Sequence, residues 1–504
     1  MAEPTFDAPW TDDDFQWLFQ SQREGATYEL LDADVLEGQF PVGDLVGTYY
    51  HNGPSIMELQ GDYMHPFEGH ALIRTIRFAE AGKVTFKSAV VETQAYKDEV
   101  QDAGQLLWRG YGPNRSWWSN FRARMTPKNV ANTCVIEYNG KVLAGFEGTS
   151  APHILDPATL ATIGQETFQD TIPVDRPFLA HTRYDAKKGV LVGASLMMGK
   201  DVTMTMYEIK DGKCVDTTGP IQLDVGYVHD FLITENYYVF LTNFIKLNPF
   251  KLVKALAGFG SLFLALIANT ARNGQVILVP RPGSKYAAEG IKTYEAPHPL
   301  FTFHPANAFE TESPEGKPVA KMYACSFQNF KFGNEFGFRP CKPGSWDPRL
   351  NAGGFSQAFY EFTCDLESSG METRVLDTRS VDFPEVHPEM EGQKTKYAYT
   401  AGCQDPALAF PFQKVIKYDL ESGSAVAEFN CGAREFLGEP VYAPRKGYTA
   451  EDDGYVLTYC YAAEKRSVDV CILNATDLAL VCRLATHQQF PYGFHGGWSP
   501  VVHF

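Results

Sequence analysis

The chain is built from short runs of strand-forming residues that are separated by turns. The segment "CVIEYNGKVLAGFEG" (134–148) places Asn139-Gly140 between two such runs, and residues 202–223 place Asp211-Gly212 between two more. Asn-Gly and Asp-Gly at a bend are the strongest short-range signals for a two-residue β-hairpin. Similar runs recur along most of the chain, so the sequence predicts an all-β fold.

The size of the chain narrows the choice among all-β folds. Many short strands with few helices indicate a sandwich, a barrel or a propeller. In a chain of 504 residues, blades of about 45 residues each would allow five to eight blades of a propeller. No internal repeat fixes that number, and no Pro/Ser-rich linker divides the chain. Helices are expected at residues 12–22, within 255–269 and at 403–408.

Charge and cysteine content exclude several classes of function. The formal net charge is −17 and no cluster of Lys and Arg is present, so a nucleic-acid partner is not expected. The ten cysteines form no CxxC pair, which argues against a zinc knuckle and favours thiols in a reducing compartment. The acidic start "MAEPTFDAPWTDDDFQWLF" lacks the features of a signal or transit peptide. These observations together predict a cytoplasmic protein.

One segment is unusually apolar. Residues 248–269, "NPFKLVKALAGFGSLFLALIAN", contain a run from Ala255 to Ala268 without a charged residue. That run is shorter than the roughly 20 residues needed to span a bilayer. Two interpretations remain open: a buried helix or cap, or a patch that dips into one leaflet and gives peripheral membrane contact.

Four of the twelve histidines stand at the edge of an apolar β-run beside aromatic residues. They are His181 in "RPFLAHTRYD", His229 in "VGYVHDFLIT", His304 in "PLFTFHPANAFE" and His495 in "QQFPYGFHGGWSP". A carbonyl and a water can satisfy any single buried imidazole. Four similar placements far apart in the chain instead suit a radial fold in which different blades direct one imidazole each to a common axis. Four neutral imidazoles there would bind a divalent metal.

Three carboxylates lie in mostly apolar or small-residue surroundings: Glu147, Asp382 and Glu439. A metal-bound histidine usually donates its second N–H to a carboxylate or carbonyl, and an unpaired carboxylate in an apolar setting is costly. These residues are therefore candidates for orienting the histidines, with a solvated turn position as the alternative for each.

The four histidine segments resemble the histidine motifs of the carotenoid cleavage oxygenases. Further similarity lies in "LVGTYYHNGPS" (45–55), "PKNVANTCV" (127–135), "ILDPATLATIG" (154–164), "GEPVYAPRKGYTAEDDGYVLTYCY" (438–461) and "VCILNATDLALVCRL" (470–484). The resemblance runs from about residue 27 onward, which suggests an N-terminal segment 1–26 and one domain over 27–504. Within the family the pattern looks closest to the apocarotenoid oxygenases of cyanobacteria.

The resemblance implies a fold and a site. It implies a seven-bladed β-propeller with a dome of loops and short helices over an axial Fe(II), held by His181, His229, His304 and His495. It matches Glu147, Asp382 and Glu439 to the family's carboxylates around those ligands, and Thr133 to a threonine near the open iron position. The aromatic residues beside the ligands are expected to line the substrate tunnel or to pack as core: Phe146, Phe303, Tyr492, Phe494 and Trp498.

The sequence departs from the family pattern at two places. Asp382 stands where the family usually has glutamate, and the shorter side chain predicts a water between this carboxylate and its histidine. In "HPFEGHALI" (65–73), His70 and Ala71 replace an aspartate and a glycine, which leaves the conformation of that loop open.

The function implied by the resemblance is the oxidative cleavage of a conjugated C=C bond by O₂ into two carbonyl products. An apocarotenoid is the first candidate substrate and a stilbene-like phenolic alkene is the second. Which of Tyr49, Tyr96, Tyr111 or Lys128 faces the tunnel would bear on that choice. A metal-free, carotenoid-binding propeller is an alternative from another class, and a non-oxidative isomerisation with ester hydrolysis is a third possibility.

Overall fold

The computed structural model describes most of the chain. The described residues are 11–108, 117–124, 128–147, 149–198, 202–223, 227–259, 265–269, 271–328, 330, 357–405, 408 and 410–503.

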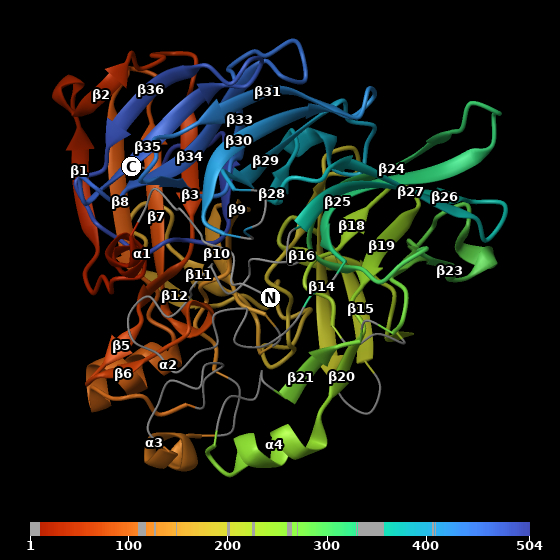
Figure 1. Ribbon diagram of the computed structural model, residues 1–504, viewed down its shortest axis with the longest axis horizontal. Helices are drawn as coiled ribbons and strands as arrows, with labels where there is room; N and C mark the ends of the chain where they lie inside the picture. The colour runs from red at the N-terminus through yellow and green to blue at the C-terminus, as the bar shows by residue number, and fades with distance from the viewer. Residues whose placement is uncertain are drawn as a thin grey trace, which may run out of the picture.

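Seven antiparallel sheets follow one another around a common axis (Figure 1). The first holds β1 (Ala26–Leu30), β8 (Val84–Val90), β7 (His70–Phe78), β3 (Gly47–His51) and β37 (Gly496–Ser499), with β4 (Pro54–Ile56) beside β7. The second holds β12 (Thr162–Gln165), β11 (His153–Leu155), β10 (Lys141–Gly145) and β9 (Cys134–Tyr138). The third holds β13 (Arg183–Asp185), β14 (Val190–Met198), β15 (Val202–Lys210) and β16 (Lys213–Thr217), with β17 (Ile221–Leu223) beside β15.

The remaining four sheets have the same plan. They hold β18 (Leu232–Ile233), β19 (Tyr237–Thr242), β22 (Gln275–Pro280) and β23 (Lys292–Glu295); β24 (Phe301–Glu312), β25 (Pro318–Phe327), β26 (Gln357–Asp365) and β27 (Met371–Asp377); and β28 (Val381–Glu385), β29 (Tyr397–Cys403), β30 (Phe412–Asp419) and β31 (Ser424–Asn430). The seventh holds β2 (Val35–Gly38), β36 (Leu480–Ala485), β35 (Ser467–Asn474), β34 (Gly454–Ala462) and β32 (Glu435–Leu437), with β33 (Val441–Pro444) beside β34. The predicted seven-bladed β-propeller is confirmed.

The hairpins that suggested this fold form as expected. Asn139 and Gly140 have φ of 51° and 72° between β9 and β10, and Asp211 and Gly212 have φ of 50° and 74° between β15 and β16. Positive φ at both central residues is the requirement of a type I′ turn, which matches the twist of the flanking strands.

Strands from the two ends of the chain close the ring of blades. The C-terminal β37 pairs with β3 in the first blade, with Tyr49 opposite Trp498. The N-terminal β2 pairs with β36 in the seventh blade. Because each closing strand lies in a blade built mainly from the other end of the chain, the ladder hydrogen bonds tie the ends together. The position of His495, directly before β37, therefore depends on ring closure.

The described part of the N-terminal segment packs on this closure. Helix α1 (Asp12–Leu18) begins with Thr11 as its N-cap, and Trp17, Leu18 and Phe19 are buried in the core shared by the first and seventh blades. The Leu18 carbonyl accepts a hydrogen bond of 2.7 Å from the Tyr492 amide. The first ten residues lie outside the described part of the chain.

Short helices and two small hairpins gather on one side of the blades (Figure 1). They include β5 (Glu58–Leu59), β6 (Asp62–Tyr63), a 3₁₀ turn η2 (Pro66–Glu68), α2 (Gln94–Tyr96), a π-helical turn η3 (Lys97–Ala103), α3 (Trp117–Arg122), β20 (Ile245–Leu247), α4 (Pro249–Leu256) and β21 (Leu266–Ala268). Among the described residues, three further 3₁₀ turns lie elsewhere, at η1 (Asp32–Asp34), η5 (Ala287–Glu289) and η8 (Pro388–Met390). This group corresponds to the expected dome.

The helix predictions were only partly right. A helix in the 12–22 region is present but ends at Leu18. Of the helix expected within 255–269, Ala255 and Leu256 lie in α4, which begins earlier, at Pro249, where the side chain of Asn248 caps it. Leu266–Ala268 form a strand instead, and residues 260–264 lie outside the described part of the chain. At 403–408, Cys403 instead ends β29; residues 406 and 407 lie outside the described part. No helix among the described residues has the length and hydropathy needed to span a bilayer.

Candidate metal centre

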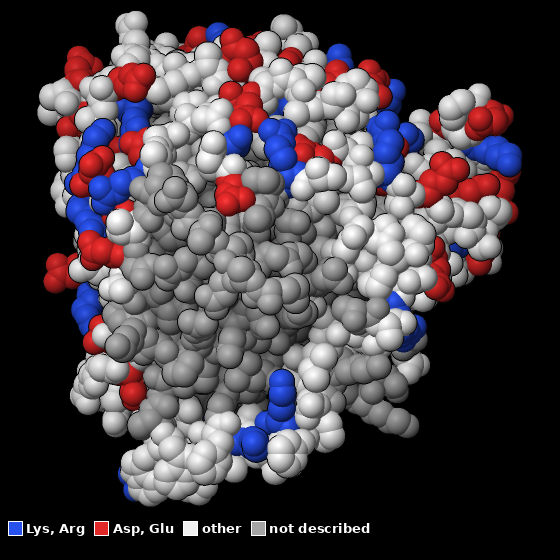
Figure 2. Space-filling view, in the orientation of Figure 1, with Lys and Arg blue, Asp and Glu red and all other residues white. Residues whose placement is uncertain are grey.

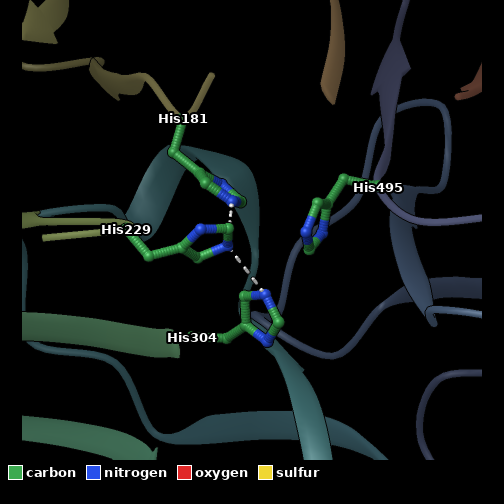
Figure 3. Close-up of side chains that lie close together, drawn as sticks. All are labelled: His181, His229, His304 and His495. Carbon is green, nitrogen blue, oxygen red and sulfur yellow. Dashed lines mark hydrogen bonds between the residues drawn. The ribbon is translucent and has the colours of Figure 1, made fainter. Parts of the chain in front are cut away.

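Four histidine side chains converge where the edge strands of four blades meet. His181 precedes β13, His229 precedes β18, His304 lies in β24 and His495 precedes β37. Figure 3 shows the four rings facing a common centre from four different segments. The edge strand of each of these four blades begins there, so one side chain from each blade reaches the axis.

The distances between the ring nitrogens fit one metal ion. His229 Nε2 lies 3.1 Å from Nε2 of His181 and 3.1 Å from Nε2 of His304. One ligand atom from each of the four rings lies within 4.8 Å of the others. Metal–nitrogen bonds of about 2.1 Å place neighbouring octahedral ligands about 3.0 Å apart and opposite ligands about 4.2 Å apart. The cluster therefore has the dimensions of a first-row metal site with four imidazole ligands.

Carboxylates hold three of the four rings from behind. His304 Nδ1 lies 2.7 Å from Asp382 Oδ1, and His495 Nδ1 lies 2.7 Å from Glu439 Oε1. His229 Nδ1 pairs in the same way with Glu147. A proton on Nδ1 that is donated to a carboxylate leaves Nε2 with a free lone pair. The three carboxylates predicted from the sequence thus lie where they fix both the orientation and the tautomer of the rings.

Two of these carboxylates are themselves anchored. The Tyr227 hydroxyl donates to the second oxygen of Glu147, and the Gly496 amide donates to Glu439 Oε2 at 2.6 Å. Tyr227 lies two residues before His229, and Gly496 directly follows His495. The two chain segments that deliver His229 and His495 therefore each also supply a donor that fixes the carboxylate behind the histidine.

His181 has different neighbours, which the sequence analysis missed. Its Nδ1 lies 3.6 Å from Asp230 Oδ2 and 3.5 Å from the sulfur of Cys134. Asp230 pairs with Arg183, whose Nε also donates to the Phe231 carbonyl at 2.8 Å. Burial raises the pKa of the Cys134 thiol well above its usual value, so this sulfur stays protonated beside the ring.

The water predicted between Asp382 and His304 was wrong, because the carboxylate reaches the ring directly. The pairing of β28 with β29 shifts between Asp382 and Glu385, and Phe383 has a φ of 51°. An extra residue at such a bulge bends the strand and re-aims the neighbouring side chain. With the strand bent in this way, the aspartate side chain is long enough to contact the ring at 2.7 Å.

Burial and neighbouring charges set the protonation of the rings. Burial lowers the pKa of His181 well below its usual value, lowers that of His304, and lowers that of His495 to about 3. Burial also acts on His229, but its pair with Glu147 outweighs it and leaves the pKa raised. Three of the four imidazoles are therefore neutral at physiological pH, which is the form that binds a metal.

The aromatic residues predicted to line a tunnel fall into two groups. Phe303 packs edge-on to His229 with ring centroids 5.3 Å apart, and Phe494 contacts Phe67 of η2 at 5.5 Å. Tyr492 instead lies in the core, where its hydroxyl donates to the Leu437 carbonyl at 2.5 Å. Trp498 packs on Phe78 at 6.0 Å.

Two other residues predicted to lie near the ligands, Thr133 and Phe146, are linked to the site by their backbone. The Thr133 carbonyl accepts a hydrogen bond of 3.2 Å from the His495 amide. Phe146 is buried and directly precedes Glu147. Phe383, which the sequence analysis did not select, lies with its ring centroid 5.0 Å from His304 and 5.3 Å from His495.

The loop with His70 in place of the family's aspartate is well packed. His70 begins β7, is fully buried, and lies with Nε2 3.1 Å from Glu99 Oε2. The same oxygen lies 2.7 Å from Lys128 Nζ. This buried triad links the first blade to η3 and to the segment before β9, which defines a conformation that the sequence left open.

Comparisons with known proteins agree with this geometry. The family model described as "Retinal pigment epithelial membrane protein" matches residues 18–500. The chain belongs to the carotenoid cleavage oxygenase family. It is therefore an enzyme of the carotenoid cleavage class, and the resemblance seen in the histidine motifs is confirmed.

Two relatives and one solved structure illustrate the similarity. The chain is 31% identical to apocarotenoid-15,15'-oxygenase from Synechocystis over 96% of each chain. It is 29% identical to chloroplastic carotenoid cleavage dioxygenase 7 from Arabidopsis thaliana over 96% of this chain and 90% of that protein. A crystal structure of cobalt-substituted Synechocystis ACO superimposes with a TM-score of 0.85 at 30% identity, covering 98% of this chain and 100% of that one.

The contact between Asp382 and His304 can be tested by mutation. We expect Asp382→Ala to weaken Co²⁺ binding to the metal-stripped protein by about 10- to 100-fold, because the imidazole loses its orienting acceptor. Titration followed by the visible absorption of Co²⁺ measures the change. Glu428→Ala serves as the control, since Glu428 lies on β31 of the same blade and pairs with Arg379 and Lys414. Equal affinity for Asp382→Ala and wild type would contradict the assignment.

Proposed function

We propose that this chain is an Fe(II)-dependent oxygenase that cleaves one conjugated C=C bond of an apocarotenoid into two carbonyl products. The observation that carries the proposal is the convergence of four imidazole nitrogens, three of them backed by carboxylates. An alkene and O₂ contain all the atoms of two carbonyl products, so the reaction needs no net proton transfer. The absence of a general base from the proposed mechanism follows from that balance.

The donor set suits iron. Four neutral imidazoles contribute no charge, so the ion keeps its 2+ charge, and four ligands leave coordination positions open. When bound, Fe(II) would supply the one-electron chemistry that makes O₂ reactive toward an alkene. Glu147, Asp382 and Glu439 would hold the imidazoles in place during that reaction.

Aromatic side chains would form the wall against which the polyene reacts. Phe303 lies against His229 and continues into a cluster with Phe301, Phe327 and Phe330. Such a wall excludes water and presents π-faces that stabilise positive charge on a conjugated chain. An extended apolar substrate fits these surroundings.

A phenolic substrate has less support. Lys128, which could have held a phenolate, is buried and occupied by Glu99 at 2.7 Å. Tyr49 is fully buried in the core of the first blade, and Tyr96 packs edge-on to His70. Tyr111 lies outside the described residues. The residues described here thus favour the apocarotenoid over the stilbene.

We also propose that α3 and α4 touch a membrane surface from which the substrate enters. The exposed apolar side chains of these helices and of the turn after α4 are Trp117, Trp118, Phe121, Phe250, Val253, Leu256 and Phe259. The two helices lie side by side (Figure 1), joined by a 3.0 Å hydrogen bond from Trp117 Nε1 to the Ala257 carbonyl. Over these helices the surface is mainly white with blue basic groups at its border (Figure 2). Apolar side chains flanked by Lys251 and Lys254 suit the headgroup region of an anionic leaflet.

The reaction is tested by loading the metal-stripped protein with Fe(II) without oxygen and then adding ¹⁸O₂. Apocarotenals of several lengths, stilbenes and a retinyl ester are supplied in parallel, and products are identified by mass spectrometry. We expect two carbonyl products from an apocarotenal, only with Fe(II) present and with label from O₂. His495→Ala should abolish turnover, whereas His487→Ala should retain it, because His487 lies at the surface against Asp34.

Other outcomes identify the alternatives. Preferred cleavage of stilbenes would show that the substrate is a phenolic alkene and not an apocarotenoid. Isomerised retinol without label from O₂ would identify a non-oxidative reaction. A protein that binds a carotenoid but takes up no metal would be a binding propeller and would overturn the proposal.

The membrane contact is tested with vesicles that contain phosphatidylglycerol. We expect the double variant Phe250→Ser/Phe259→Ser to bind at least ~10-fold more weakly, since burying each phenylalanine contributes about 1.5–3 kcal/mol. The control is Ile163→Ser/Val426→Ser, which removes two exposed apolar side chains from the outer strands β12 and β31. Co-sedimentation measures binding. Equal losses in both double variants would contradict a specific contact through α4.

A further inference from the structure

A second feature of the axis is a large cavity that begins at the histidines. Its volume is about 880 Å³, and His181, His304 and His495 line one part of it. Exposed residues such as Tyr184, Glu389 and Lys446 also line it. The cavity therefore connects the histidine cluster with the surface along the innermost strands of the blades.

Acidic side chains outnumber basic ones among the lining residues. The basic side chains are already paired: Arg183 with Asp230 and Glu391, Arg445 with Asp44 and Asp453, and Lys446 with Glu80. These pairs neutralise the cations, and further carboxyl groups of the lining have no ion-pair partner in the part of the chain that the structure describes.

Glu385 is the clearest of these carboxylates. Among the described residues it has no ion-pair partner, and burial together with the neighbouring Glu439 and Glu391 raises its pKa well above the usual value. Because burial and the repulsion between like charges disfavour its ionised form, Glu385 holds its proton in the absence of a cation. A cation in this part of the cavity would allow Glu385 to ionise and bind it.

The aromatic side of the histidine cluster is different. Phe303 packs on His229, and Phe494, which directly precedes His495, packs on Phe67. None of these three residues lines the acidic cavity, in contrast to Phe383. A hydrated dication that entered between aromatic rings would lose water without gaining oxygen ligands, which is costly. Carboxylates and water in the cavity supply such ligands throughout the passage.

We propose that this cavity is the route by which a divalent metal ion reaches the four histidines. Metal ions and the apolar substrate then approach the site through different surroundings, one acidic and one aromatic. The inference rests on the proposed metal site, and it adds a role for the lining carboxylates, which attract the cation and pass it inward.

Gly497 on β37 allows the route to be narrowed without disturbing its neighbours. It lines the cavity, and a Cβ added there would meet only the Val135 carbonyl oxygen, at 3.4 Å. Gly497→Leu therefore directs its side chain into open space. Gly164 on β12 offers a matched control, because a Cβ there meets nothing within 4 Å and the residue lies outside the cavity lining.

The test is the kinetics of metal exchange in the full-length, metal-stripped protein. Co²⁺ binding is followed by stopped-flow absorption, and release is followed after addition of excess EDTA. For Gly497→Leu we expect both rates to fall at least ~10-fold with an unchanged Kd, because a narrower passage slows both directions equally. Gly164→Leu should exchange metal at the wild-type rates.

A second variant tests the charge of the route independently of its width. Glu385→Gln should slow Co²⁺ binding, because glutamine cannot ionise and bind the passing ion as a carboxyl group can. Circular dichroism establishes that both cavity variants fold.

The outcomes separate the route from the metal site itself. Wild-type exchange rates in both folded cavity variants would overturn the route while leaving the metal site intact. A wild-type protein that binds no Co²⁺ would overturn the proposed metal site, and the route with it.

Discussion

The arrangement of the whole molecule depends on the convergence of four imidazole Nε2 atoms at one point. Lone pairs 3.1 Å apart repel one another unless a cation or a shared proton lies between them. The carboxylates behind His229, His304 and His495 hold the Nδ1 protons outward, so the inward nitrogens are the ones that can bind a metal. A metal ion satisfies all four at once, and the rest of the propeller holds the rings in position for it.

Closure of the propeller between the first and seventh blades brings His495, the last of the four histidines, to the metal site. The turn before β37 is held by backbone hydrogen bonds in both directions between Asn52 and residues 494–495, and by the fully buried Arg74, which donates to the Pro491 carbonyl at 3.2 Å. Close packing explains why glycine occupies position 493 in this turn. A Cβ on Gly493 would lie 2.0 Å from the His51 ring. The aromatic residues around the turn thus mainly build its support, while His495 alone projects toward the metal.

The sequence was most informative where the cause of a structure is local. The turn at Asn139-Gly140 is determined by those two residues. Each histidine is likewise close in sequence to the strand and the aromatic residues beside which it lies in the structure. The start of α4 was also determined locally, because Asn248 followed by Pro249 is a helix-start signal. The prediction missed it because it relied on the apolar run that follows. By contrast, Asp230 approaches His181 from another blade, and the bulge at Phe383 that brings Asp382 onto His304 depends on pairing with β29. Such features arise from packing between distant segments and could not be predicted from the residues alone.

Anomalous diffraction from crystals of the Co²⁺- or Fe²⁺-loaded protein, recorded at the absorption edge of the metal, tests the central claim most directly. The account predicts one strong peak about 2.1 Å from Nε2 of His181, His229, His304 and His495. A peak elsewhere in the molecule, or one bonded to fewer than three of these nitrogens, would contradict it.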